Sequence, residues 1–299
     1  MDRNQYLIIG GSTKCGTTSL FNYFEFHPGV CACSMKESRY FLEPEYKLIA
    51  QKRDHSGIKN FNELFAASKP EKVHVEATPD YLYSEHALGR IAHELPNAKM
   101  VFILRKPKGR LESWYKYARQ LGLIDEPTTL EAFIKMQQGL TDPPQHLRSL
   151  EQGCYSKYLE RAYALLGKDR VMVCFYEDLD KDPENLCKRV AAFAGLNPAY
   201  FSGFEFKVFN KSAASKATLP ARMFRSFKRL VKPLKQQLPK GIRKKLKLAS
   251  HRIESGLDSS STSYQKTQQV DEVTASFIEQ YYSAEAGKIK SLTGLVPPW

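Results

Sequence analysis

The sequence has no uninterrupted run of about 18 apolar residues, the length that a membrane-spanning helix requires. Near its start, apolar character extends only from Tyr6 to Ile9, which is too short for the core of a secretory signal peptide. We therefore expect a cytoplasmic protein without a transmembrane helix.

Paired cysteines are missing as well. The chain has six cysteines, and none of them forms a C-x-x-C pair of the kind that binds zinc or serves redox chemistry. Cys15, Cys174 and Cys187 stand in patterns where a small apolar residue fits. These features argue against a disulfide-stapled scaffold and predict reduced thiols and no metal cluster.

Acidic residues are absent between Lys207 and Arg252, where the sequence has 15 lysines and arginines. The rest of the chain has 30 basic residues against 32 acidic ones, so the net charge of +13 comes from this one stretch. We call residues 207–254 the basic segment. Its uncompensated charge predicts an anionic partner.

A strand-loop-helix pattern opens the chain. Residues 5–26 read QYLIIGGSTKCGTTSLFNYFEF. The backbone N–H groups of such a loop and the positive end of the following helix form a site for an anion, to which Lys14 adds a cation. The usual nucleoside-triphosphate loop has the pattern G-x-x-x-x-G-K-[ST]. Here Gly11 and Gly16 keep the glycine spacing, but Thr17 replaces the expected lysine.

Short apolar runs alternate with helical patterns along the rest of the chain, which is typical of an α/β domain with a parallel sheet. We predict further strands at 30–33, 73–77, 99–104 and 171–175, the last as the fourth central strand. Predicted helices cover 61–67, 85–94 after a Ser84 cap, 153–166, 183–194 and 271–292. Asp178 is a further expected helix cap. We expect one P-loop-like domain over 1–299, with the basic segment as a helical part of it.

Five stretches follow the order seen in one enzyme family. They are the loop around Lys14, the motifs 36–41 and 75–81, the strand end 102–105 with Ser113 eight residues after Arg105, and the closing segment through Trp299. Together they resemble the sulfotransferases that use 3′-phosphoadenosine 5′-phosphosulfate (PAPS), in the branch with heparan sulfate and many bacterial carbohydrate sulfotransferases. The order of the motifs is more specific than any single motif.

The resemblance implies a role for each motif. Glu37 would be the general base for the acceptor hydroxyl, and Lys14 would neutralise charge on the donor, so both are candidate catalytic residues. Arg105 and Ser113 would bind the 3′-phosphate of PAPS. The other cofactor-binding candidates lie in the loop and the first helical turn: Lys14, Cys15, Gly16, Thr17, Thr18 and Ser19.

Two positions depart from the family pattern. Arg39 stands where the heparan sulfate enzymes often have a histidine, which leaves Glu37 without a histidine partner. Ala77 stands where they commonly have a lysine, which argues against a highly sulfated acceptor. Further candidates for contacts with the acceptor are Glu76, Tyr81, Arg39 and Lys211.

The basic segment has one apolar stripe at helical spacing, formed by Leu219, Met223, Phe227, Leu230, Val231 and Leu234. A second basic helix is expected at 241–252. Three partners remain open for this segment: an acidic acceptor or the PAPS entrance, an anionic membrane surface, and nucleic acid. We expect no nucleic acid, because recognisable nucleic-acid-binding motifs are missing.

The resemblance implies transfer of a sulfuryl group from PAPS to a hydroxyl of an acceptor, and we expect the acceptor to be a carbohydrate, either a polysaccharide or a glycolipid. Such transfer depends on positioning and charge stabilisation and needs no metal. An ATP-dependent kinase is one alternative, but Gly-Lys-Thr is missing and Asp178 is a poor match for its magnesium carboxylate. The other is an inactive polysaccharide- or membrane-binding module, against which the intact candidate residues argue.

Overall fold

The computed structural model describes residues 4–46, 55, 58–65, 72–125, 127–207 and 270–299. All of them belong to one compact unit, and a second unit, Asn210–Gln269, lies outside the described residues. The helices predicted in the basic segment, and Lys211, therefore lie outside them too. The prediction of one domain over the whole chain stays a prediction.

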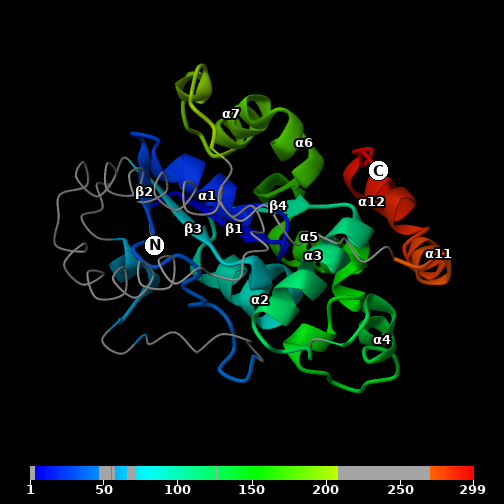
Figure 1. Ribbon diagram of the computed structural model, residues 1–299. Coiled ribbons are helices and arrows are strands. Elements are labelled where there is room, and N and C mark those ends of the chain that lie inside the picture. Colours follow the sequence, from blue (N-terminus) through cyan, green and yellow to red (C-terminus); the bar gives the residue numbers. More distant parts are fainter. Residues whose placement is uncertain (1–3, 47–54, 56–57, 66–71, 126, 208–269) are drawn as a thin grey trace, which may run out of the picture. The chain divides into compact units, whose positions relative to one another are not determined.

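Five parallel strands form the central sheet, in the order β2-β3-β1-β4-β5 (Figure 1). The strands are β1 (Tyr6–Gly11), β2 (Val30–Ala32), β3 (Val73–Ala77), β4 (Lys99–Leu104) and β5 (Val171–Phe175). Leu7 pairs with Val75 on one side and with Lys99 on the other. Because the strands are parallel, their carboxyl ends share one edge of the sheet, and the chain leaves β1 near the middle of that edge.

The predicted strands are confirmed, with two corrections. β2 ends at Ala32, one residue earlier than expected. β5 was expected to be central, but it pairs with β4 and stands last in the strand order.

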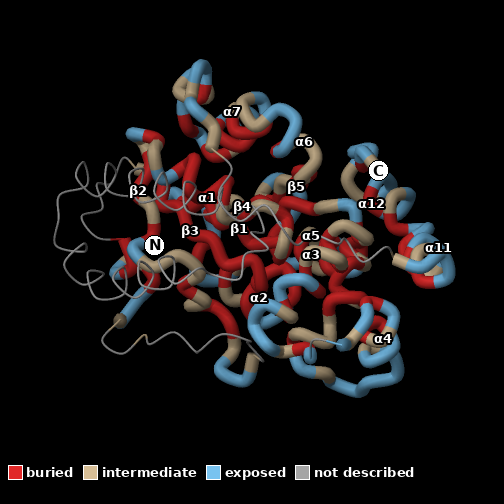
Figure 2. The backbone as a smooth tube through the Cα atoms, in the orientation of Figure 1, coloured by how far each residue is buried: buried red, intermediate tan, exposed pale blue. Residues whose placement is uncertain are grey.

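Helices cover both faces of the sheet, which explains why its strands are continuous apolar runs (Figure 2). On one face Leu7 and Ile9 pack with α1 (Thr17–Glu25), α6 (Tyr176–Lys181) and α7 (Pro183–Phe193). On the other face Ile8 packs with α2 (Glu85–Glu94) and α5 (Tyr155–Leu166). The strand period of two residues thus assigns neighbouring side chains of β1 to opposite cores.

A third apolar cluster joins α3 (Pro107–Gln120) and α4 (Leu130–Lys135) to α11 (Glu272–Tyr281). The single closing helix expected at 271–292 is wrong, since a second helix, α12 (Glu285–Thr293), begins after a break. The Glu285 carboxylate is buried and accepts hydrogen bonds from the Ser156 amide and hydroxyl, both at 3.0 Å. The break therefore lets α12 cap the amino end of α5.

Short 3-10 turns complete the described fold: Phe61–Leu64, Pro79–Tyr83, Gln145–Leu147, Glu151–Gly153, Lys168–Arg170 and Pro198–Phe201. The first of them replaces the predicted helix at 61–67 within the described residues, and the helix expected from Gly153 begins at Tyr155.

The helix caps were predicted with mixed success. The cap at Ser84 is confirmed, because its Oγ accepts a hydrogen bond from the Ala87 amide (3.0 Å). Asp178 was wrong as a cap, since it lies inside α6, and Asp182 instead caps α7 through the Asn185 amide (3.1 Å).

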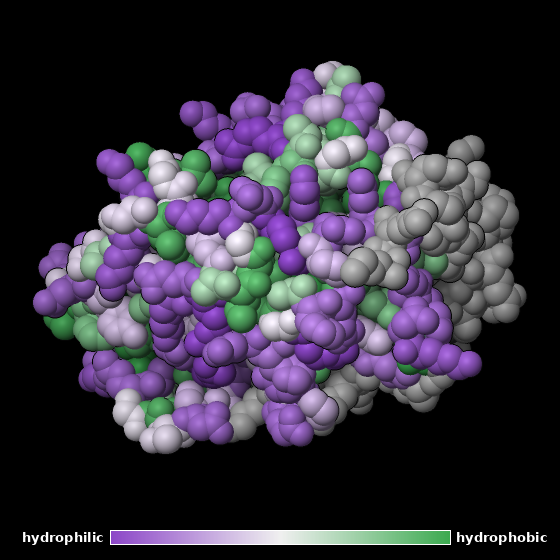
Figure 3. Space-filling view, turned by 180° about the vertical axis from the view of Figure 1, so that it is seen from behind, coloured by the Kyte–Doolittle hydropathy of each residue, from purple (hydrophilic) through white to green (hydrophobic). Residues whose placement is uncertain are grey.

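The described surface is predominantly hydrophilic on the face shown in Figure 3, with hydrophobic residues in small groups. Among the described residues no helix is both long and apolar enough to cross a bilayer. The last residue, Trp299, packs against Phe175 of β5 with ring centroids 5.1 Å apart, at the margin of the core that contains Ile8.

Candidate active site

The loop between β1 and α1 owes its shape to two glycines. Gly16 precedes α1 with a φ of 85°, and a Cβ added there would lie 2.8 Å from Cδ2 of Leu179. At Gly11 an added Cβ would lie 2.7 Å from Cβ of Leu82. Both positions therefore require glycine, one for its backbone conformation and for space, the other for space alone.

The amino end of α1 has the features that the predicted anion site requires. N–H groups in the first turn of a helix have no partner within the helix, and Thr17, Thr18 and Ser19 form that turn. No acidic residue occupies it. Cys15 differs from the prediction, because its amide donates to the Ser12 carbonyl within the loop (3.3 Å) and its thiol is buried.

Lys14 lies partly buried in this loop, at a φ of 68°. Its Nζ is 4.1 Å from the ring centroid of Tyr117 on α3, a cation–π contact. Burial and the nearby Arg105 charge together lower the pKa of Lys14 to about 8. The part of this shift that comes from Arg105 reflects local positive charge, which would attract a bound anion.

Arg105 and Ser113 also reach this neighbourhood. Arg105 Nη1 donates to the Lys14 carbonyl (3.4 Å), and the guanidinium lies 4.5 Å from the Tyr176 ring centroid. A Cβ added at Gly109 would be 3.3 Å from Nε of Arg105. Ser113 follows Gly109 by one helical turn, so it lies on the face of α3 that Arg105 approaches.

Sequence reasoning missed Arg110, the largest fully buried side chain. Its guanidinium donates to the Ser12 hydroxyl (3.2 Å) and the Thr13 hydroxyl (2.9 Å) of the loop. It also donates to the Ser149 carbonyl and the Gln152 side chain, both at 2.8 Å. The loop thus rests on a buried cation. A charged residue on the buried stripe of α3, next to Leu111 and Trp114, was the signal that could have revealed it.

Glu37 lies on a second loop at the same edge of the sheet. Its amide donates to the carbonyl of Ala77, the last residue of β3 (3.0 Å). Its carboxylate accepts from Lys36 Nζ (3.0 Å) and from Arg39 Nη2 (3.1 Å). Burial raises the pKa of Glu37, but the charges of Lys36 and Arg39 outweigh burial, so the pKa is lowered. The carboxylate is therefore ionised at neutral pH, as a general base must be.

The two loops face one neighbourhood. The charge of Glu37 acts on the pKa of Lys14 and on that of Tyr117, whose ring Lys14 covers. The structure thus brings the two predicted catalytic residues together. Arg39, predicted to contact the acceptor, is instead the partner of Glu37 in this structure.

Two predicted acceptor contacts are placed differently by the structure. Glu76 and Tyr81 are fully buried. Burial raises the pKa of Glu76 to about 7. The Tyr81 hydroxyl lies 3.5 Å from the Ser38 hydroxyl, and it accepts from the Phe41 amide at 3.5 Å. Because neither side chain reaches solvent, direct contact with an acceptor is wrong for both in this structure.

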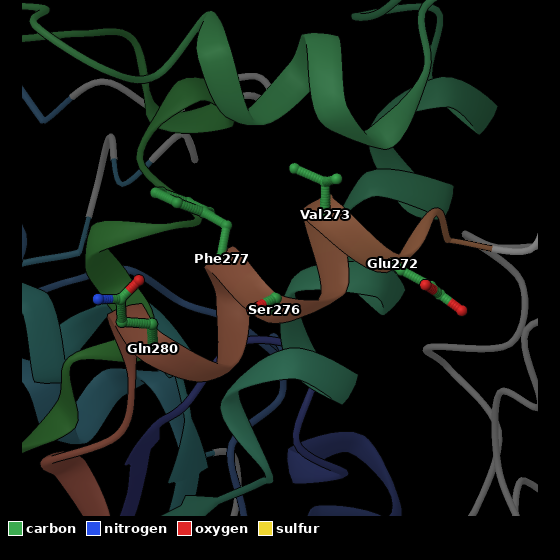
Figure 4. Close-up of a pocket in the computed structure, with 5 residues that line it drawn as sticks. All are labelled: Glu272, Val273, Ser276, Phe277 and Gln280. Carbon is green, nitrogen blue, oxygen red and sulfur yellow. The ribbon is translucent and has the colours of Figure 1, made fainter.

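An open hollow along α11 is not a rival site (Figure 4). Its lining is Glu272, Val273, Ser276, Phe277 and Gln280, all from one helix. Val273 and Phe277 project from the same side of that helix. One carboxylate and no basic side chain line it, so it lacks what an anionic donor needs.

The described residues give little support to a magnesium-dependent site. Leu179 and Tyr176 of α6 approach Gly16, while Asp178 lies 3.7 Å from Arg189 in an ion pair. In the described part of the chain no three or more His, Cys, Asp or Glu side chains gather as metal ligands. The expectation of a metal-free reaction stays a prediction.

The chain is similar to known proteins in sequence and in fold. The chain is 26% identical to human bifunctional heparan sulfate N-deacetylase/N-sulfotransferase 3 over 209 residues, which are 67% of this chain and 23% of that protein. It is 29% identical to bifunctional heparan sulfate N-deacetylase/N-sulfotransferase 1 of Xenopus tropicalis over 206 residues, 66% of this chain and 23% of that protein. The chain thus spans about a quarter of the length of these relatives.

A solved structure is similar in fold. The sulfotransferase from Alicyclobacillus acidocaldarius superposes with a TM-score of 0.56 at 21% identity, covering 78% of this chain and 93% of that one. Residues 4–248 match the family described as "Sulfotransferase domain". With that match over most of its length, the chain belongs to the sulfotransferase family.

Proposed function

We propose that the protein transfers a sulfuryl group from PAPS to a hydroxyl group of an acceptor. One observation carries the proposal. Lys14, on the loop between β1 and α1 (the phosphate loop), contacts the Tyr117 ring, and the charge of Glu37, on the loop beside it, acts on the pKa of Tyr117. A donor-side cation and an ionised base are thus close enough for their charges to interact, as transfer between a donor anion and a hydroxyl needs.

The donor side fits PAPS. The first turn of α1 would hold its 5′-phosphate. Arg105 and Ser113 would hold its 3′-phosphate, since guanidinium and hydroxyl groups donate hydrogen bonds to phosphate oxygens. PAPS supplies a sulfuryl group already bonded to a good leaving group. Arg110 stabilises the conformation of the phosphate loop, because its buried guanidinium donates hydrogen bonds to the hydroxyls of Ser12 and Thr13.

Glu37 and Lys14 have different roles in the proposed reaction. Glu37 takes the proton of the acceptor hydroxyl, while Lys36 and Arg39 hold its carboxylate in place. Lys14 lies on the donor side, where it neutralises the negative charge that develops on the leaving group.

A carbohydrate is the acceptor we propose. The names of the relatives support a carbohydrate, because they describe N-sulfotransferases of heparan sulfate. Ala77, in place of a lysine, favours an acceptor without many sulfate groups. We propose a cytoplasmic location, with the basic segment turned to the acceptor or to an anionic membrane.

Two titrations and an assay test the function. We expect the purified protein to bind 3′,5′-bisphosphoadenosine and to bind ATP much more weakly, whereas a kinase would show the reverse. Sulfate transfer from PAPS to a panel of carbohydrates then separates an enzyme from an inactive binding module. Glu37→Gln should remove nearly all turnover and leave the affinity for bisphosphoadenosine close to wild type. Lys14→Ala should lower both the turnover and the affinity for bisphosphoadenosine.

A further inference from the structure

The loop that carries Glu37 is fastened to β3 residue by residue. Three successive amides of the loop donate to three successive residues at the end of β3. The Glu37 amide donates to the Ala77 carbonyl (3.0 Å), and the Arg39 amide donates to the Thr78 hydroxyl (3.1 Å). Between them, the Ser38 amide donates to Glu76 Oε1 (3.0 Å). Because the amides of residues 37–39 are all hydrogen-bonded, the backbone that carries their side chains has little freedom to move.

Glu76 is the centre of this attachment. The same Oε1 also accepts from the Ser38 hydroxyl (3.0 Å) and from the Thr78 hydroxyl (2.6 Å). Thr78 in turn holds the Arg39 amide, so Glu76 fixes the loop at Ser38 directly and at Arg39 through one intermediary. All three anchoring side chains, Glu76, Ser38 and Thr78, are buried.

The conformation that these bonds maintain is a strained one. Glu37 and Arg39 both have left-handed backbone, with φ values of 54° and 58°, on either side of Ser38. Side chains other than glycine rarely adopt this region unless the surroundings impose it. Without the bonds to Ser38, the loop would relax toward ordinary backbone angles, and the carboxylate of Glu37 would move.

We propose that Glu76 is a positioning residue for the reaction: by anchoring Ser38 it holds Glu37 and Arg39 in the geometry that proton transfer requires. This inference rests on the proposed function, in which Glu37 is the base. Glu76 acts through the loop and touches neither donor nor acceptor. It explains why a carboxylate predicted to meet the acceptor is found buried behind the loop.

Glu76→Ala and Glu76→Gln form the central comparison. The alanine variant removes the carboxylate that accepts the hydrogen bonds of Ser38 and Thr78. We therefore expect kcat to fall by about 10- to 100-fold, as for a displaced catalytic group. Affinity for bisphosphoadenosine should stay within about twofold, because the phosphate loop is untouched. Glutamine keeps an oxygen that can accept the same bonds and should restore most of kcat.

Val75→Ala is the matched control. Val75 is equally buried on the same strand but belongs to the opposite apolar core. This variant should lose stability and keep kcat, which separates positioning from general damage to β3. Ser38→Ala should lower kcat in the same direction as Glu76→Ala, and the double variant should be little worse than Glu76→Ala alone, since the two residues act through one contact.

Hydrogen exchange tests the inference without turnover. Amides of residues 37–39 should exchange at least about tenfold faster in Glu76→Ala, and at the wild-type rate in Glu76→Gln and Val75→Ala. If the amides exchange faster in Glu76→Ala but the wild-type protein shows no sulfate transfer, the proposed function is refuted and the anchoring role of Glu76 stands. Unchanged exchange, or a parallel loss of kcat and bisphosphoadenosine affinity, would overturn the positioning role.

Discussion

At the scale of single residues, Lys14 gives the donor side of the site a response to pH. Its pKa of about 8 lies below the usual lysine value because of burial and the charge of Arg105. The cation is therefore present below pH 8 and is lost as the pH rises through that value. The lowered pKa of Glu37 keeps the base ionised throughout this range.

We predict that kcat/KM for the donor falls as the pH rises above about 8, since this ratio reports groups of the free enzyme. In Lys14→Arg the charge persists at high pH, so the alkaline decline should move upward or vanish, even if the maximal rate is lower. A decline that stays at the same pH in this variant would assign it to another group.

Arg105 offers a second test at this scale. Removing a charge-assisted contact to the 3′-phosphate should cost on the order of 2 kcal/mol, about thirtyfold in affinity. We predict that Arg105→Ala weakens bisphosphoadenosine by that factor and changes the affinity for adenosine 5′-phosphate much less. Isothermal titration measures both. Equal losses for the two ligands would mean that Arg105 serves the loop, through the Lys14 carbonyl, and not the 3′-phosphate.

Sequence patterns selected residues that lie in loops at the strand ends. The structure places Lys14 near both Arg105 and Glu37, and the roles predicted for these residues stay predictions. Arg110 was missed and Glu76 was misplaced for the same physical reason. The role of each depends on being buried against a second segment distant in the chain, such as Ser149 for Arg110 and Ser38 for Glu76. A local pattern can indicate that such a residue is buried, as the apolar stripe of α3 does for Arg110, but it does not identify the distant partner that defines its role.

At the scale of elements, β3, β4, β5 and α2 were predicted to the residue, because apolar runs and a serine cap define them locally. The closing helix was not predicted correctly. It is interrupted before Glu285, whose carboxylate caps α5, an element distant in the sequence. Asp178 failed for a related reason, since β5 runs straight into α6 and leaves no room for a cap there.

Two glycines, one in the turn from β1 into α1 and one inside α2, allow a matched test. Gly16→Ala forces a side chain into left-handed backbone and against Leu179, so we predict a loss of stability on the order of 2 kcal/mol and loss of bisphosphoadenosine binding. Gly89 lies inside α2, where an added Cβ meets nothing within 4 Å. Gly89→Ala should therefore stabilise by up to about 1 kcal/mol.

Thermal unfolding with and without the ligand measures both glycine variants. Wild-type stability and ligand binding in Gly16→Ala would contradict the role given to this turn. A destabilised Gly89→Ala would show that the protein resists alanine at glycines in general.

At the scale of the whole molecule, charge is divided unevenly between the described fold and the basic segment. Reversal of Arg222, Arg225 and Arg229 to glutamate should raise the acceptor KM and flatten its dependence on ionic strength, because surface attraction between opposite charges is screened by salt. Steady-state kinetics at two salt concentrations measures this. An unchanged KM together with lost binding to anionic vesicles would favour the membrane as the partner.

The return of residues 270–299 to the fold has a consequence for biosynthesis. Tyr282 donates to the Leu150 carbonyl (2.6 Å) and packs on Gly153, next to the turn whose Ser149 and Gln152 hold Arg110. The ribosome delivers these residues after everything they cover. While the chain is still being translated, Leu150 and Gly153 lack their contacts with Tyr282, so we expect the contacts of Arg110 with Ser149 and Gln152 to form fully only after α11 and α12 have emerged and docked.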